Sequence, residues 1–350
     1  MPGACQDAPA PCASATRVCS HHRSMTSHPY AIEAEGLTKR FGTTQALAGI
    51  DLAVREGTVL GVLGPNGAGK TTAVRILATL ITADRGSARV AGFDVVRDAR
   101  QVRQTIGLTG QYASVDEDLT GMQNLVLIGQ LLDLPSRAAR ARARELLEWF
   151  DLADAGSRMA KTYSGGMRRR LDLAASLVGR PSVIFLDEPT TGLDPAKRED
   201  MWEVVRRLVT DGSTVLLTTQ YLDEADALAD EITVIDHGRV IAHDTPDGLK
   251  QIVGGQTLEV RPTDPSRTAE ATAILAEITG GRVESPRRGT LSVSVPDDSA
   301  LPTTAARLAS AGITVTEFSL HLPSLDEVFF TLTGRSASDD ESQSDTKEAA

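Results

Sequence analysis

The sequence predicts an α/β fold with a mainly parallel sheet, followed by a small α+β domain. Short apolar runs over residues 58–64, 182–189 and 213–220 are typical of buried central strands, and stretches with helical character separate them. Near residue 245 this alternation ends and a different order of strands and helices begins. In a mainly parallel α/β sheet, ligands bind at the carboxyl ends of the strands.

Residues 1–29 come before any strand or helix pattern. They are rich in Ala, Pro and Ser, which predicts a disordered segment. They hold every cysteine of the chain and a histidine pair: Cys5, Cys12, Cys19, His21 and His22. A zinc site is the alternative, but this spacing differs from that of structural zinc sites. The segment lacks the apolar run of a secretory signal, and Met25 offers an alternative start.

The predicted α/β domain covers residues 30–245. It opens with alternating apolar and polar residues over 30–42, as in an antiparallel strand. Helix-rich sequence then extends over about residues 104–180, where we expect a helical subdomain beside the sheet. The arginines of residues 135–150 are expected on the solvated face of a helix, because the chain as a whole is acidic.

Residues 254–335 are expected to form the small domain. Its pattern is strand, helix, hairpin, helix and strand, in this order: 257–262, 267–280, 281–295, 301–312 and 313–322. This is the β-α-β-β-α-β order of a ferredoxin-like α+β domain.

A final helix is predicted over residues 324–334. Its apolar residues follow the helical spacing i, i+3, i+4 and i+7: Leu325, Val328, Phe329 and Leu332. This stripe predicts packing against the small domain, and a role in regulation or assembly is the alternative. The tail over residues 336–350 is polar and acidic, which predicts disorder.

The overall charge of the chain is acidic. Lys plus Arg number 36 and Asp plus Glu number 47, which gives a net charge of −11. This balance argues against a nucleic-acid partner, because such a partner usually requires a basic face. No apolar stretch reaches the roughly 18–20 residues of a membrane-spanning helix, and Gln and Asn interrupt the nearest one, residues 122–134. The absence of cysteine from the body of the chain is typical of a cytosolic protein.

The segment GPNGAGKT over residues 64–71 matches the phosphate-binding pattern G-x-x-x-x-G-K-[ST], between an apolar strand and a helix. Its glycines let backbone N–H groups turn toward phosphate oxygens. Lys70 is expected to reach the β- and γ-phosphates, and the Thr71 hydroxyl is expected to face Mg²⁺. The predicted ATP-binding residues of the loop are Gly64, Pro65, Asn66, Gly67, Ala68, Gly69, Lys70, Thr71 and Thr72.

The segment VIFLDEP ends a predicted strand with two carboxylates. Asp187 is placed to hold Mg²⁺ together with Thr71. Glu188 is placed to accept a proton from the water that attacks the γ-phosphate. The alternative is a strand end that simply begins a turn, and the phosphate-binding loop in the same chain argues against it.

With YSGGM over residues 163–167, these motifs resemble the ATP-binding subunit of an ABC transporter, and the resemblance covers about residues 32–244. It implies a P-loop ATPase domain with a mixed sheet and a helical subdomain. It also implies a head-to-tail dimer with two composite sites, in which each signature helix points its N-terminus at the ATP of the other chain. The signature residues facing the partner's ATP would be Ser164, Gly165, Gly166 and Met167. Tyr163 and Met167 depart from the common LSGGQ form of this motif.

The resemblance places three further positions. Phe41 resembles the aromatic residue that stacks on adenine, and a core aromatic is the alternative. Gln111 resembles the glutamine that contacts Mg²⁺ and the attacking water. Asp194 would lie in the loop that crosses the dimer interface, or else in a plain turn before a helix.

Gln220 stands where this family normally has a switch histidine. Its amide can donate a hydrogen bond to the γ-phosphate, but it cannot take up a proton. Glu188 is then the sole base, acting with Gln220 and Lys70 as the catalytic group. This glutamine, the YSGGM segment and the trailing domain resemble the daunorubicin-resistance type of ATPase subunit.

The resemblance implies an ATP- and Mg²⁺-dependent ATPase on the cytoplasmic face of the cell membrane. It would act with a second copy of itself and a separate membrane permease to export a drug or antibiotic. Lipid, polysaccharide or ion cargo is one alternative, and an ABC ATPase of translation or DNA repair is another. A nucleotide-binding regulator without turnover is a third, which Glu188 argues against.

Overall fold

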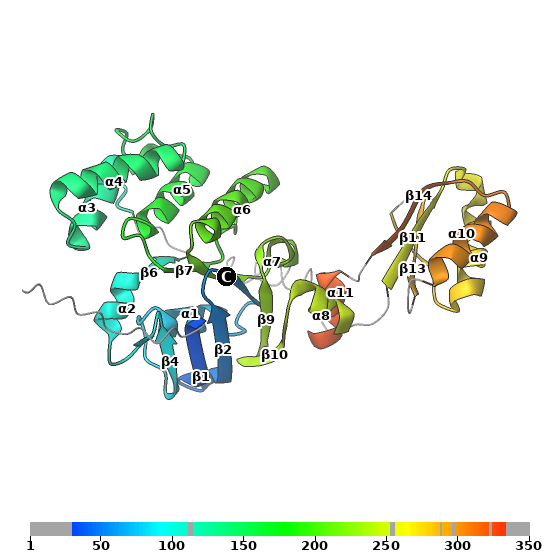
Figure 1. Ribbon diagram of the computed structural model, residues 1–350, viewed down its shortest axis with the longest axis horizontal. Helices are drawn as coiled ribbons and strands as arrows, with labels where there is room; N and C mark the ends of the chain where they lie inside the picture. The colour runs from blue at the N-terminus through cyan, green and yellow to red at the C-terminus, as the bar shows by residue number, and fades with distance from the viewer. Residues whose placement is uncertain are drawn as a thin grey trace, which may run out of the picture.

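The structure is a computed structural model that describes residues 30–110, 115–252, 256–287, 289–295, 299–321 and 324–333. The predictions for residues 1–29, for Gln111 and for the tail 336–350 therefore lie outside the described residues. Figure 1 shows a larger α/β body and a smaller α/β body, with helices α8 (Pro246–Ile252) and α11 (Leu325–Thr333) between them.

The larger body begins with an antiparallel sheet in the order β2-β1-β4-β5. Its strands are β1 (Tyr30–Phe41), β2 (Thr44–Arg55), β4 (Arg85–Val90) and β5 (Phe93–Asp94). Ile32 lies opposite both Val54 and Val90, and all three side chains are buried. The alternating pattern predicted for the start of the domain thus gives a sheet with one face in the core.

A second, six-stranded sheet has the order β10-β9-β3-β8-β7-β6. Its strands are β3 (Val59–Leu63), β6 (Ile106–Thr109), β7 (Val183–Asp187), β8 (Thr214–Thr219), β9 (Glu231–Asp236) and β10 (Arg239–Asp244). Only the β9–β10 pair among these is antiparallel, so the sheet is mixed, as predicted. Every residue of β3, β7 and β8 is buried, which explains their continuous apolar sequences.

Helices cover both faces of this sheet. Helix α1 (Lys70–Leu77) contacts β2 and β4 as well as β7, and so lies between the two sheets. The remaining helices of the larger body are α2 (Ala99–Thr105), α3 (Gly121–Leu131), α4 (Ser136–Trp149), α5 (Gly165–Ser176), α6 (Pro195–Thr210) and α7 (Leu222–Leu228), with a 3₁₀ turn at Ala160–Thr162. In Figure 1, α3, α4 and α5 lie together beside α6, away from the antiparallel sheet.

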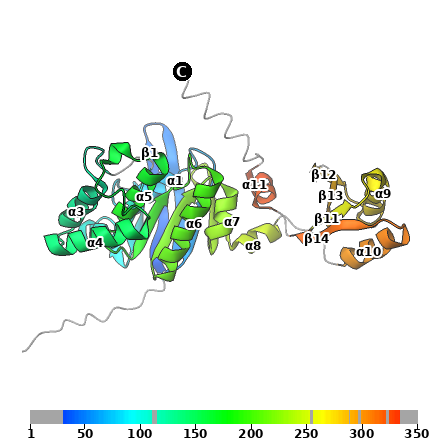
Figure 2. The ribbon, with the colours of Figure 1, turned by 90° about the horizontal axis from the view of Figure 1, so that it is seen from above.

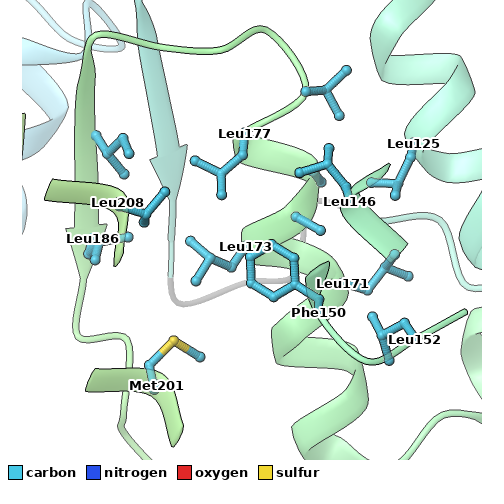
Figure 3. Close-up of a cluster of buried hydrophobic side chains, with 14 of the residues drawn as sticks. Leu125, Leu146, Phe150, Leu152, Leu171, Leu173, Leu177, Leu186, Met201 and Leu208 are labelled. Carbon is cyan, nitrogen blue, oxygen red and sulfur yellow. The ribbon is translucent and has the colours of Figure 1, made fainter. Parts of the chain in front are cut away.

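The helical subdomain is anchored by one apolar cluster, drawn in Figure 3. Leu171, Leu173 and Leu177 of the α5 segment meet Leu146 and Phe150 of the α4 segment in this cluster. The same cluster continues to Leu125 of α3, Leu186 of β7 and Met201 and Leu208 of α6. Helix α5 is therefore packed against both the subdomain and the sheet.

The expected helix-rich range of about 104–180 was too wide at its start. Residues 106–109 form strand β6, which pairs in parallel with β7 from Ile106 opposite Val183 to Thr109 opposite Leu186. A short apolar run cannot be assigned to a helix or a strand by periodicity alone. The pairing with β7 makes residues 106–109 a strand. The helices of the subdomain begin with α3 at Gly121.

The smaller body has the predicted β-α-β-β-α-β order. Its elements are β11 (Gln256–Pro262), α9 (Thr268–Thr279), β12 (Glu284–Arg287), β13 (Thr290–Val295), α10 (Ala300–Ser310) and β14 (Val315–His321), with a 3₁₀ turn at Pro265–Arg267 between β11 and α9. Its strands form an antiparallel sheet in the order β12-β13-β11-β14. Leu258, Leu275 and Leu308 share its core. The prediction of a ferredoxin-like α+β domain is confirmed.

Helix α11 does not pack where the sequence suggested. Leu325, Val328 and Phe329 are buried against Leu63 and other side chains of the larger body, and α11 contacts α7 and α8. Figures 1 and 2 both show α11 beside α8. The spacing of its apolar residues identified the buried face, but it could not identify the partner, and the prediction of packing against the small domain was wrong.

Candidate nucleotide-binding site

Three predicted motifs meet at one edge of the mixed sheet because of its register. Leu63, the last residue of β3, lies opposite Thr219, the last residue of β8. Asp187, the last residue of β7, lies opposite Thr218 of β8. The phosphate-binding loop after β3, the carboxylates after β7 and Gln220 after β8 therefore leave adjacent parallel strands at the same end.

The loop after β3 surrounds the Lys70 side chain. The Lys70 ammonium donates to the Gly64 carbonyl at 2.7 Å and to the Pro65 carbonyl at 3.2 Å. Gly69 has a φ of 112°, and a Cβ there would lie 2.5 Å from the carbonyl oxygen of Ala46, so the close approach of β2 requires glycine. Within the predicted set, Asn66 and Gly67 are exposed, Thr71 and Thr72 are half-buried, and Gly64, Pro65, Ala68, Gly69 and Lys70 are buried.

Asp187 links the phosphate-binding loop to strand β8. Its Oδ1 accepts from the Thr71 hydroxyl at 3.1 Å and from the Thr218 hydroxyl at 2.6 Å, and the residue is 4% exposed. A carboxylate and a hydroxyl at one point, next to a phosphate-binding loop, are hard oxygen ligands of the kind Mg²⁺ takes. The residues present therefore fit Mg²⁺. Gln111, the third predicted ligand, lies outside the described residues.

Glu188 lies beside the loop lysine. Its Oε1 is 3.6 Å from the Lys70 ammonium nitrogen, and its side chain is largely buried. Its φ is 52°, a left-handed backbone conformation that is uncommon for residues other than glycine. The Glu188 N–H donates to the carbonyl and the hydroxyl of Thr218 at 3.1 and 3.2 Å, which holds this conformation from the β8 side. The structure thus brings together the lysine and the carboxylate that we expected to act on the γ-phosphate.

The signature segment opens helix α5. Ser164 caps the helix, and its hydroxyl accepts from the Met167 N–H at 3.3 Å. Ser164, Gly165 and Gly166 line a cleft of 490 Å³ together with Glu188, Gly192 and Lys197. No residue of the phosphate-binding loop lines this cleft.

The two departures from the common signature have structural roles. Tyr163 is buried, and its hydroxyl donates to the Ala155 carbonyl at 2.7 Å, which fixes the start of the signature within the helical subdomain. Burial also raises the pKa of Tyr163. Met167 is partly buried and packs against the apolar cluster of the subdomain. Tyr163 and Met167 therefore hold the segment against the helical subdomain, and neither side chain takes the place of a backbone N–H donor at the N-terminus of α5.

The remaining predicted residues lie around this centre. Phe41 is 50% exposed at the end of β1, so the alternative of a core aromatic was wrong. It pairs with Thr44 at the start of β2, the strand whose Ala46 approaches the loop at Gly69. Gln220 is half-buried directly after β8.

Asp194 begins the helix that follows the carboxylates. It caps α6 by accepting from the Lys197 N–H at 3.0 Å, and it also pairs with the Lys197 ammonium. Hydrogen bonds from Lys197 lower the pKa of Asp194, which stays exposed. The turn-and-cap geometry is therefore present, and the position at a dimer interface stays a prediction.

Sequence reasoning missed three residues of this region. Thr218 binds Asp187 and Glu188, and its only sequence signal was a hydroxyl at the end of a central strand. Arg169 of α5 is largely buried and donates to the Glu188 carbonyl at 3.1 Å, although an arginine on a surface helix predicts a solvated face. Glu224 of α7 is 1% exposed, and burial raises its pKa.

Two family models match the chain. The ABC transporter model matches residues 47–191, and the model for the C-terminal domain of DrrA1-3-like ATP-binding proteins matches residues 245–333. In the part of the chain that the structure describes, none of the helices has both the length and the apolar content of a membrane-spanning segment.

The chain is similar to curated proteins over most of its length. It is 56% identical to the daunorubicin resistance ATP-binding protein DrrA2 of Streptomyces coeruleorubidus, over 92% of this chain and 99% of that protein. It is 52% identical to the daunorubicin/doxorubicin resistance ATP-binding protein DrrA of Streptomyces peucetius, over 88% of this chain and 94% of that protein.

Solved structures agree with the fold. An ATP-binding cassette of an ABC transporter in its ADP conformation has a TM-score of 0.57 at 27% identity, over 62% of this chain and 91% of that one. Fold and site together define an ABC ATPase, a class whose subunits dimerise and work with membrane permeases. Within that class the chain belongs to the family of daunorubicin-resistance ATP-binding proteins.

Proposed function

We propose that this chain supplies the ATP-driven step for the export of a drug or antibiotic by a separate membrane permease, on the cytoplasmic face of the membrane. The relatives that are 56% and 52% identical carry daunorubicin resistance in their names. A Nod factor export ATP-binding protein of Ralstonia nicotianae is less similar, at 38% identity. This ranking favours a drug over the lipid, polysaccharide and ion alternatives.

The observation that carries the ATPase part of the proposal is the convergence of Lys70, Asp187 and Glu188 at one sheet edge. The loop over residues 64–72 binds the phosphates of ATP, and Phe41 stacks on the adenine. Thr71, Asp187 and Gln111 are the proposed ligands of Mg²⁺, which supplies charge neutralisation at the β- and γ-phosphates when bound.

Hydrolysis needs mainly positioning and charge stabilisation. Water attacks the γ-phosphorus in line with the β–γ bridging oxygen, and Glu188 takes the proton of that water. The bridging oxygen keeps the electron pair of the broken bond and leaves with ADP. The Gln220 amide positions the γ-phosphate and the water, and Lys70 offsets the charge that develops.

We propose that the site is completed by the signature of a second copy. In this chain, the cleft that Ser164 lines includes Glu188 but no residue of the phosphate-binding loop, which supports a division of the phosphate contacts between two chains. Ser164, Gly165, Gly166 and Met167 would then present a helix N-terminus to the γ-phosphate held by the partner, with Asp194 at the interface. ATP favours the closed dimer because only that state offers the phosphate both sets of donors.

Mixing two inactive variants tests this arrangement. Lys70→Ala removes the loop ammonium. Gly165→Asp places a carboxylate at the signature N-terminus, and a Cβ on Gly165 meets nothing within 4 Å in its own chain. Mixed dimers hold one intact composite site, so we expect the mixture to recover up to about a quarter of the parent ATPase rate. A mixture no more active than the separate variants would contradict the composite site.

A further inference from the structure

Arg169 is a buried arginine on the signature helix that the mechanism above does not use. Its guanidinium donates to three backbone carbonyls: Gly110 at 2.8 Å, Pro189 at 3.0 Å and Glu188 at 3.1 Å. Its side chain is only 17% exposed. An arginine on an outer helix face would instead leave its guanidinium in water.

The three carbonyls belong to two loops of the site. Gly110 follows β6 and directly precedes Gln111, whereas Glu188 and Pro189 follow β7. A planar guanidinium presents its donors in a fixed fork, so it can hold three carbonyls at once where a lysine ammonium could not match the geometry. The carboxylate of Asp172, one turn along α5, lies 3.8 Å away and offsets the buried charge.

Glu188 needs a constraint of this kind. Its φ of 52° is a strained conformation that persists only where the surroundings hold it. Thr218 accepts from its N–H on one side, and Arg169 donates to its carbonyl on the other. The backbone of the proposed base is therefore held between strand β8 and the signature helix.

We propose that Arg169 is a positioning residue for ATP hydrolysis, which fixes the Glu188 backbone and ties Glu188 and Gly110 to helix α5. This inference rests on the proposed function of Glu188 as the base. The helix whose N-terminus would bind the partner's phosphate thereby also sets the position of the base in its own chain.

The test compares two arginine-to-lysine variants of the full-length chain. Arg169→Lys keeps the charge but loses the fork, so we expect kcat for ATP to fall about 10- to 100-fold while KM stays within about twofold. Equilibrium binding of Mg²⁺–ATP, which needs no base, is expected to stay unchanged.

Arg142→Lys is the matched control. Arg142 of α4 donates to the Leu177 carbonyl at 2.8 Å, at the other end of α5, and its side chain is 12% exposed. This variant removes a similar bond without touching the site, so its kcat is expected to stay within about twofold of the parent. If Arg169 had only a structural role, the two variants would lower the melting temperature by similar amounts, and their kcat values would also be similar.

Two results would overturn the inference: an Arg169→Lys kcat equal to that of Arg142→Lys, or a loss of Mg²⁺–ATP binding as large as the loss of kcat. Glu188→Gln, measured in parallel, separates this failure from that of the proposed function. If Glu188→Gln still turns over ATP at the parent rate, the base assignment fails. If Glu188→Gln is inactive and Arg169→Lys is not impaired, only the role of Arg169 fails. Should Arg169→Lys not fold, Arg169→Gln replaces it under the same criteria.

Discussion

The ion pair between Lys70 and Glu188 links the phosphate-binding loop to the proposed base. The two side chains are 3.6 Å apart, and both are largely buried. A bound γ-phosphate would give Lys70 a second anionic partner, which leaves Glu188 available to the attacking water. The roles of these two groups can therefore be separated by substitution.

Glu188→Gln preserves the shape of the side chain but removes its ability to take a proton. We expect the variant to bind Mg²⁺–ATP like the parent and to lose about 100-fold or more in kcat. Gln220→Ala removes only a positioning amide and is expected to lose about tenfold. Steady-state ATPase rates and equilibrium ATP binding measure both effects. Parent-like rates in both variants would contradict the assignments of Glu188 and Gln220.

Glu224 makes stability depend on pH. Burial raises its pKa above the ordinary value of 4.5, and the nearby groups of Thr219, Thr190 and Trp202 lower it only in part. Below 4.5 the carboxyl is neutral whether the chain is folded or unfolded. As the pH rises above that value, the unfolded chain releases the proton first, so the stability cost of this group grows with pH until the raised folded-state pKa is passed, and it keeps its full size above that pKa.

Glutamine stays neutral throughout that pH range. We therefore expect Glu224→Gln to gain stability relative to the parent as the pH rises from about 5 to 8, measured as the difference in melting temperature. The exposed Glu199 of α6 provides a control, because Glu199→Gln removes the same formal charge. A difference between parent and Glu224→Gln that stays constant over this range would refute the explanation.

Helix α11 shows how a short element can join two parts of the chain. The chain leaves the larger body after α8, builds the smaller body, and returns as α11 to pack against α7 and α8. Its buried face meets Leu63, which directly precedes the phosphate-binding loop, and Leu222, which lies two residues after Gln220. The end of the chain thus supports the two elements that carry Lys70 and Gln220.

Adjacent phenylalanines on α11 test this packing. Phe329 is 4% exposed and Phe330 is 55% exposed. We expect Phe329→Ala to reduce the free energy of unfolding of the larger body by about 3 kcal/mol, because a large buried side chain is lost. Phe330→Ala should change it by less than about 0.5 kcal/mol. Thermal unfolding of the two full-length variants gives the comparison, and equal effects would rule out the packing of Phe329.

The sequence carries one phosphate-binding loop and one signature, and among the described residues no residue of that loop lines the 490 Å³ cleft at the signature. Two copies therefore provide two complete sites if they pair head to tail. Each copy carries a net charge of −11, so association must also overcome mutual repulsion.

Dilution tests this dependence on a second copy. We expect the ATPase rate per chain to fall as the protein is diluted below its dissociation constant, because single chains lack the signature donors at the γ-phosphate. Sedimentation of the Glu188→Gln variant in the presence of ATP would give that dissociation constant. A rate per chain that stays the same after the dimer has dissociated would refute the shared site.

The positions of Lys70, Asp187 and Glu188 could be predicted because each lies at or after the end of a buried strand whose apolar run is visible in the sequence. Parallel strands bring their carboxyl ends to one edge, so the three groups had to converge. The roles of these residues in catalysis stay predictions. Arg169 could not be found in this way, since the Gly110 carbonyl that it binds lies 59 positions away in the sequence.

The sequence by itself determined the local features: the phosphate-binding loop, the capped signature helix, the strand ends with their carboxylates, and the order of elements in the small domain. Their geometry depends on neighbouring residues and on hydrogen bonds within a few positions. The tertiary structure decided which surfaces meet, as with β6 in the sheet, α11 on the larger body and Arg169 against two loops. Those contacts join distant segments, and an apolar stripe or a buried charge does not specify its partner until the chain has folded.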